Sequence, residues 1–262
     1  MATPATKSSD EAWRELDLPF HESPRVLRDL PGGRSNKSTL IEADGQRWVV
    51  RINSSKSAFF GIDRHAEESI LRIAATAGIA PAVVYCSVSS GVLISEYIDG
   101  QQWRADALSN AQNLEKFFAV VRVTHGLQTA TPVVDQYQHA ENYWNSLLAA
   151  QFVATDELLS ERDQILSERS KDTSSVNANV LCHRDLTPLN VIEGNCRLYL
   201  LDWEYAARGA AAFDFASIAA EWDVPSDTLV ANFQLNRGEL ERAQALYRYT
   251  CHLWEALDQL PM

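Results

Sequence analysis

Three polar side chains in the second half of the chain have the types and spacing that phosphoryl transfer requires. Asp185 is followed by Asn190 after four intervening residues, and Asp202 comes after a further apolar run. A carboxylate can accept the proton of an attacking hydroxyl, while an amide oxygen and a second carboxylate are suitable ligands for a hard cation. We therefore expect Asp185 and Asn190 to be catalytic, and Asn190 and Asp202 to bind Mg²⁺ against the phosphates of a nucleotide.

A polar, glycine-containing loop in the first forty residues could hold those phosphates. It covers residues 30–38 and precedes a run of strand-forming residues. Backbone N–H groups in such a loop can surround a phosphate, although a double glycine before a strand is more often only a turn. The residues that we expect to contact the nucleotide here are Gly33, Ser35, Asn36 and Lys37.

A further phosphate contact is expected from Arg51, on the second of the two strands that follow this loop. A guanidinium can neutralise a phosphate through two parallel hydrogen bonds. Its ion-pair partner should come from the next helix, where Glu67 and Glu68 are adjacent. Glu67 is preferred because it shares a helix face with Leu71, four residues later. A solvated position remains the alternative for both Arg51 and Glu67.

The elements that must position these side chains are readable from periodicity. Residues 39–42 and 46–52 alternate as strands around Asp44-Gly45, a dipeptide typical of tight hairpins. Asp63 can cap a helix that Gly78 ends, and a short helix is expected over residues 11–18. Two more strands cover residues 83–86 and 92–98. Helical periodicity then dominates residues 106–170, 213–222 and 238–257, and short strands flank the Asp185 motif.

The composition excludes several classes of partner. The chain has 262 residues, 46% of them hydrophobic, which is enough for one large domain or two small lobes. The net charge of −12 argues against nucleic acid or an anionic membrane as a partner. The beginning of the chain lacks the apolar core of a signal peptide, and no apolar run is long enough to span a bilayer. Four scattered cysteines suggest free thiols in a reducing cytoplasm.

Six motifs follow one another between about residues 31 and 222: Gly-Gly-x-Ser-Asn-Lys, Val-Val-Arg-Ile-Asn, Ile-Asp-Arg-x-x-Glu, Ile-Ser-Glu-Tyr-Ile-x-Gly, His-Arg-Asp-Leu-x-x-x-Asn and Leu-Leu-Asp-Trp-Glu-Tyr-Ala. In this order the chain resembles the aminoglycoside phosphotransferase/choline kinase superfamily. Asp-Trp-Glu stands where protein kinases have Asp-Phe-Gly, and Ala-Pro-Glu is missing, so a small-molecule acceptor is favoured. Arg184 departs from the pattern, because these enzymes more often have Gly or Asn there.

The resemblance implies a bilobal, protein-kinase-like α+β fold. Residues 1–96 would form a β-rich nucleotide-binding lobe and residues 97–262 a mainly helical catalytic lobe, with ATP between them. His183 would brace the catalytic loop, and Asp214 would have a structural role. Glu96 and Ile98 fall at the expected hinge, where backbone groups pair with adenine and an apolar side chain packs on the base.

Within the superfamily, the choline/ethanolamine kinases are the most similar branch, and bacterial thiamine kinases come next. The resemblance implies that the acceptor hydroxyl meets Asp185. It also implies that the cationic head lies among Tyr205, Glu221, Trp222, Tyr249 and Trp254. A trimethylammonium group donates no N–H hydrogen bond, so aromatic faces and a carboxylate are the groups suited to hold it. A core position for Trp254 is an equal alternative.

We therefore expect an ATP- and Mg²⁺-dependent kinase that phosphorylates a primary hydroxyl of a small cationic metabolite, choline or ethanolamine first. Thiamine kinase and aminoglycoside phosphotransferase are the alternatives within the same class. A nucleotide-binding protein without catalysis is the alternative from another class. The chain is expected to be cytoplasmic, not inserted into a membrane, and a monomer or homodimer.

Overall fold

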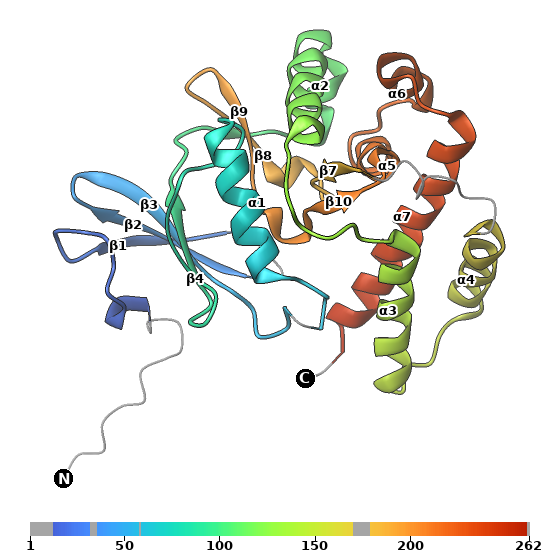
Figure 1. Ribbon diagram of the computed structural model, residues 1–262, viewed down its shortest axis with the longest axis horizontal. Coiled ribbons are helices and arrows are strands. Elements are labelled where there is room, and N and C mark those ends of the chain that lie inside the picture. Colours follow the sequence, from blue (N-terminus) through green and yellow to red (C-terminus); the bar gives the residue numbers. More distant parts are fainter. Residues whose placement is uncertain (1–12, 32–35, 58, 170–178, 261–262) are drawn as a thin grey trace.

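The computed structural model describes residues 13–31, 36–57, 59–169 and 179–260. Its first part is a twisted sheet with one helix, and its remainder is mainly helical (Figure 1). The N-terminal helix expected over residues 11–18 is replaced, in the described part, by a single 3₁₀ turn over residues 13–15.

Five antiparallel strands form the sheet, in the order β1-β2-β3-β5-β4. Their bounds are Arg25–Leu30 for β1, Lys37–Ala43 for β2, Gln46–Ile52 for β3, Val83–Ser87 for β4 and Val92–Glu96 for β5. The expected hairpin is present, with both Asp44 and Gly45 at positive φ, as a two-residue turn of this kind requires. The edge strand β1 was not expected, because its Arg, Asp and Leu residues show little alternation.

Helix α1 (Arg64–Thr76) lies between this sheet and the helical part of the molecule (Figure 1). The Asp63 side chain caps it by accepting hydrogen bonds from the backbone N–H groups of His65 and Ala66. Its apolar stripe of Ile70, Leu71 and Ala74 is buried, and Gly78 follows the helix at positive φ. The helix therefore begins and ends where the sequence indicates, and it presents Glu67 inward.

Six longer helices make up most of the second part. They are α2 (Ala111–Gly126), α3 (Gln136–Ala149), α4 (Asp156–Arg169), α5 (Ala211–Glu221), α6 (Ser226–Phe233) and α7 (Arg237–Asp258). Helix α6 was not expected, because its short apolar stripe follows a proline and looks like a loop. Helix α7 packs against α5 and α3, so it forms one wall of the region below the catalytic loop (Figure 1).

Short strands connect the helices near the motif that contains Asp185. They are β6 (Gln101–Gln102), β7 (Val180–Cys182), β8 (Val191–Gly194), β9 (Arg197–Leu200) and β10 (Ala207–Gly209). Strand β7 pairs with β10, and β8 lies between β6 and β9. The catalytic motif thus leaves β7 and enters β8, while Asp202 comes directly after β9.

Two hydrophobic clusters join the sheet-containing part to the helical part. The larger one combines α1 residues such as Ile70 and Leu71 with Phe117 of α2 and Leu200 of β9. The second combines Phe60, from the segment before α1, with side chains of α3, α5 and α7. Among the described residues, no helix is long and apolar enough to cross a membrane.

Candidate active site

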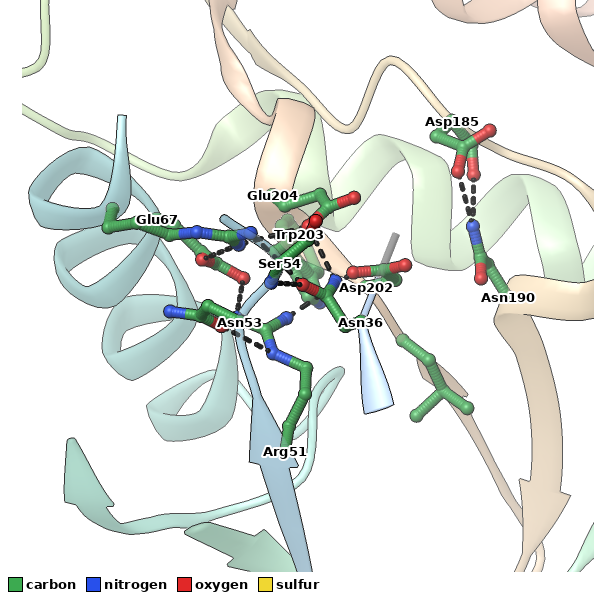
Figure 2. A network of polar contacts seen from close by, with 12 residues as sticks. Asn36, Arg51, Asn53, Ser54, Glu67, Asp185, Asn190, Asp202, Trp203 and Glu204 are labelled. Atoms are coloured by element: carbon green, nitrogen blue, oxygen red, sulfur yellow. Dashed lines mark hydrogen bonds and ion pairs between the residues drawn. The ribbon is translucent and has the colours of Figure 1, made fainter. Parts of the chain in front are cut away.

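The loop after β7 presents Asp185 with Asn190 beside it. The Asn190 side-chain Nδ2 donates to the Asp185 carboxylate at 2.7 Å and to the Asp185 carbonyl at 3.0 Å (Figure 2). Since Nδ2 is used in this way, the Asn190 amide oxygen is the atom left for a cation. Burial raises the pKa of Asp185 to about 6, and the Asn190 hydrogen bond opposes the increase. The carboxylate is therefore a stronger base than an exposed aspartate.

Buried polar groups hold this loop from behind. The Asp214 carboxylate accepts hydrogen bonds from the backbone N–H groups of His183 and Arg184, at 3.0 and 2.7 Å, and His125 contacts it at 2.9 Å. The His183 Nε2 atom lies 3.0 Å from the Leu201 carbonyl, and burial lowers the pKa of His183 to about 4, so the ring is neutral. The expected bracing role of His183 and structural role of Asp214 agree with these contacts.

Asp202 lies at the junction between β9 and a short 3₁₀ turn (Trp203–Tyr205), in the left-handed backbone region with φ of 57°. This conformation turns its carboxylate toward the space between Arg51 and the Asp185–Asn190 pair (Figure 2). Partial burial raises the pKa of Asp202, the charge of Glu204 adds to the increase, and Arg51 opposes it. Negative charge is thus crowded at this point.

Arg51 of β3 connects the sheet to this acidic group. Its guanidinium lies 2.6 Å from Glu67 and 3.3 Å from Asp202, and the Arg51 and Glu67 side chains are only 12% and 4% exposed. Glu68 instead pairs with Arg72 on the outer face of α1. Of the two glutamates that the sequence left open, Glu67 is therefore the partner of Arg51. A solvated position for Arg51 and Glu67 is wrong.

Arg64 and Glu204 are the polar residues of this group that sequence reasoning did not assign. Arg64 connects most of the others. Its guanidinium contacts Glu67 at 2.7 Å, Glu204 at 2.9 Å and the Asn36 side-chain oxygen at 3.0 Å. Glu204 also accepts a hydrogen bond from Asn36 at 2.7 Å (Figure 2). We call Asn36, Arg51, Arg64, Glu67, Asp202 and Glu204 the phosphate-side cluster. The signal that could have found Arg64 is its position at the first turn of α1, one turn before Glu67.

The other nucleotide residues expected from the sequence fall in three places. Gly33 and Ser35 lie outside the described residues. Lys37 is exposed at the first position of β2. Glu96 ends β5, while Ile98 is 5% exposed and packs against Gly194, where a Cβ atom would lie 2.7 Å from the Ile98 side chain. The side chain of Ile98 thus supports the hinge from inside.

Aromatic side chains gather around Tyr205, three residues after Asp202. The Trp254 indole N–H donates to the Tyr205 hydroxyl at 2.8 Å, so the two expected acceptor residues are neighbours. Burial raises the pKa of Tyr205, and Tyr143 and the charges of Glu204 and Asp185 add to the increase. Tyr143 of α3 lies beside Tyr205 and was not expected here.

On α7 it is Tyr247, and not the expected Tyr249, that contacts Glu221. The Tyr247 hydroxyl donates to Glu221 at 2.9 Å, whereas Tyr249 is buried with Arg162 and Glu141 as its charged neighbours on α4 and α3. Positions 247 and 254 are seven residues apart and share a helix face, while 249 is turned by about 200° from 247. Helical spacing from Trp254 could have identified Tyr247, and the assignment of Tyr249 to the acceptor is corrected.

Trp222 also has a different position from the expected one. Its ring is 3% exposed and packs between Trp103 and Phe117 in the larger core cluster. Its indole N–H donates to the Leu186 carbonyl at 2.6 Å. Trp222 therefore supports the catalytic loop from the core and does not line the acceptor region, because a buried indole needs a partner for its N–H.

Arg184, the departure from the motif, is a buried cation next to the aromatic group. It is 9% exposed, has a φ of 69°, and donates to the Gln136 side chain and the Tyr205 carbonyl. Its guanidinium lies 5.9 Å from the centre of the Phe213 ring. Arg184 thus connects the catalytic loop to α3 and to the segment after Asp202.

The residues around Asp202 fit a magnesium ion. Mg²⁺ prefers oxygen ligands, and Asn190 and Asp202 offer an amide oxygen and a carboxylate on facing sides of one space (Figure 2). The crowding of Asp185, Asp202 and Glu204 raises the pKa of Asp202, and a divalent cation would relieve that repulsion. The donor set and the charge therefore agree with the metal expected from the sequence.

Comparison with known proteins identifies similar chains. The model of a family described as "Phosphotransferase enzyme family" matches residues 26–249. Protein LicA of Haemophilus influenzae is 22% identical over 198 residues, which are 72% of this chain and 56% of LicA. This chain thus spans little more than half the length of that relative.

Solved structures show the same architecture. Choline kinase LicA from Streptococcus pneumoniae has a TM-score of 0.75 at 20% identity, covering 89% of this chain and 85% of that one. An aminoglycoside phosphotransferase in ternary complex with AMP-PNP and hygromycin B has a TM-score of 0.64 at 18% identity, covering 88% and 86%. The expected protein-kinase-like α+β fold, β-rich first and helical afterwards, is confirmed.

Proposed function

Since the chain belongs to the phosphotransferase enzyme family, we propose that it transfers the γ-phosphoryl group of ATP to a primary hydroxyl of a small cationic metabolite, choline or ethanolamine. The geometry that supports this most strongly is the position of Asp185. It lies near Asp202 and Glu204 of the phosphate-side cluster (Figure 2), and its charge also acts on Tyr205 and Tyr247, which belong to an aromatic group with Trp254. A proton acceptor between an anion site and a cation site is what such a reaction needs.

Asp185 orients the acceptor hydroxyl and takes its proton. Its raised pKa makes it a stronger base, yet at neutral pH most of it is ionised. Asn190 holds the Asp185 carboxylate through Nδ2, and Asp214 fixes the backbone on which both are carried. The loop is therefore preorganised for in-line attack.

Arg51 and the metal site hold the phosphates. Glu67 fixes the Arg51 guanidinium at 2.6 Å, and a second nitrogen of the same guanidinium lies 3.3 Å from Asp202, at the proposed metal site. Asn190 and Asp202 would bind Mg²⁺, which on binding neutralises charge on the phosphate oxygens. Gly33, Ser35, Asn36 and Lys37 are proposed to surround the phosphates, with Glu96 and Ile98 at the adenine. Asn36 would exchange its contact with Glu204 for a phosphate contact.

The acceptor head is proposed to lie against Tyr205, Tyr247 and Trp254, with Glu221 as its counter-ion. Quaternary and primary ammonium groups are attracted to aromatic faces, and a nearby carboxylate adds to the attraction. Glu221 is part-exposed and held by the Tyr247 hydroxyl, which fixes its orientation. Arg184 is a buried cation beside this group, and its guanidinium donates to the Gln136 side chain and to the Tyr205 carbonyl.

The proposal also covers the two lobes, the cellular location and the oligomeric state. Residues 1–96 and 97–262 act as nucleotide-binding and catalytic lobes of one enzyme. The enzyme is cytoplasmic and functions as a monomer or homodimer, without nucleic acid. These statements rest on composition and resemblance, and on the acidic net charge of −12.

The test is ATP consumption by the purified chain with Mg²⁺ over choline, ethanolamine, thiamine and aminoglycosides. We expect turnover with choline or ethanolamine. Preferred turnover of thiamine or an aminoglycoside would mean that the proposed acceptor is wrong. Nucleotide binding without turnover of any of these compounds would contradict the proposal that the chain is an enzyme. Asp185→Asn should lower kcat by about 10²- to 10⁴-fold, while the exposed control Asp106→Asn keeps full activity.

A further inference from the structure

The segment between β3 and α1 runs from the phosphate-side cluster to the acceptor side of the molecule. We call its described residues, 53–57 and 59–63, the β3–α1 strap. It leaves the sheet after Ile52 and enters α1 at Arg64, but its middle contacts α3 and α7. It is therefore a connection between regions that the nucleotide and the acceptor would occupy.

The near end of the strap is fixed by polar contacts. The Ser54 backbone N–H donates to the Asn36 side chain at 3.2 Å. The Ser57 hydroxyl accepts from the Arg64 guanidinium at 2.6 Å, and the same guanidinium contacts Glu204. This end cannot shift without breaking contacts of the phosphate-side cluster.

The middle of the strap carries Phe60, which is buried among aromatic residues of the helical part. Its ring stacks on Trp254 with centroids 5.3 Å apart and an interplanar angle of 25°, and it meets Tyr143 edge-on at 6.4 Å. The Phe60 carbonyl accepts a hydrogen bond from the Tyr143 hydroxyl at 3.1 Å. With 1% exposure, Phe60 cannot touch an acceptor itself.

Trp254 is the residue through which Phe60 can act. Its indole is part-exposed, and its N–H donates to Tyr205. The hydrogen bond fixes one edge of the indole and the Phe60 ring covers one face, so the orientation of the remaining face is set by both. A cation bound on an indole requires that face to be correctly aimed.

We propose that Phe60 is a positioning residue for the acceptor, acting through Trp254; this inference rests on the proposed function. The β-rich part of the chain thereby contributes to acceptor affinity from a strap that is anchored at both ends. A smaller side chain without a flat ring at position 60 should lower stability, keep the fold and misplace the indole.

The experiment compares Phe60→Leu with Phe118→Leu. Phe118 is also fully buried but packs on Phe233, within the core around α2 and α6, so the control removes the same atoms elsewhere. We expect both variants to lose stability. Only Phe60→Leu should raise the acceptor KM, by about threefold to tenfold, and it should leave the KM for ATP unchanged. Equal acceptor KM values in the two variants would overturn the inference.

A double-mutant cycle separates positioning from loss of stability. In a Trp254→Leu background, Phe60→Leu should have no further effect on the acceptor KM, because the residue through which it acts is gone. Full additivity of the two changes would contradict the proposal. If the wild-type chain turns over no cationic alcohol, the proposed function fails and this inference falls with it. If it does and Phe60→Leu behaves like Phe118→Leu, only this inference fails.

Discussion

The backbone N–H of Arg184 lies 2.7 Å from the carboxylate of Asp214, although thirty residues separate the two in sequence. Asp214 is 0% exposed and belongs to the first turn of α5, which packs against α7. The catalytic loop is thus attached to the helical core through one carboxylate. An exposed loop of this length would otherwise adopt many conformations, so the contact preorganises Asp185.

Asp214→Asn should destabilise the protein and reduce activity together. The substitution places an amide N–H against backbone N–H donors, and it removes a charge that three groups contact. Together these changes should lower the free energy of unfolding by about 3 kcal/mol. Chemical denaturation measures this, with Asp227→Asn on the surface of α6 as a control near zero. A variant with unchanged stability and kcat would mean that the loop does not depend on this contact.

Glu67→Gln should raise the KM for ATP by about tenfold and leave the acceptor KM within about twofold, because Arg51 loses its closest charged partner. Steady-state kinetics with each substrate varied separately measure both constants. The matched control is Glu68→Gln, the adjacent residue, whose carboxylate pairs with Arg72 outside the site. Equal effects of the two variants would show that Arg51 is not positioned by Glu67.

Tyr247→Phe should raise the acceptor KM by about threefold to tenfold, since Glu221 loses the hydrogen bond that orients it. Tyr249→Phe removes the same hydroxyl oxygen from position 249. That hydroxyl has no hydrogen-bond partner among the described residues. This variant should leave the kinetics unchanged and keep or slightly increase stability. The reverse ranking of the two variants in acceptor KM would restore Tyr249 to the acceptor site.

The stability of the protein should decrease in mild acid, partly because of His139. Burial lowers the pKa of this imidazole to about 3, with a further contribution from the charge of Arg184, whereas an unfolded chain takes up the proton near 6.5. The unfolded state therefore binds more protons below pH 6.5. The contribution of His139 to stability is complete above that pH and is lost as the pH falls from about 6.5 toward 3.

His139→Gln should remove this part of the acid sensitivity. Between pH 6 and pH 4, the unfolding free energy of the wild type should fall by about 1.4 kcal/mol per pH unit more than that of the variant. Urea denaturation at several pH values measures both curves. The second buried histidine, His183, has a pKa lowered to about 4 and remains in both proteins, so it cancels in the difference. Parallel curves would contradict the assignment.

Local patterns in the sequence were sufficient wherever the participating residues belong to one element or one loop. The Asp185–Asn190 pair, the Asp44-Gly45 turn and the Asp63 cap are each determined by residues a few positions apart. The same holds for the preference of Glu67 over Glu68, since a helix places them on different faces. The motif order around these residues also determined the fold class, which the family match and the solved structures support.

Only the tertiary structure decided which aromatic residues lie near Asp185. Trp222 and Tyr249 follow the expected pattern in sequence but face the core and α4, because burial of their rings there outweighs any ligand role. The residues that sequence reasoning missed come from elements far apart in the chain: Tyr143, Tyr247, Arg64 and Phe60. Their positions around the site depend on how α1, α3 and α7 pack. Periodicity defines the face of a helix, but the neighbour that covers that face is set by long-range packing that a single sequence does not display.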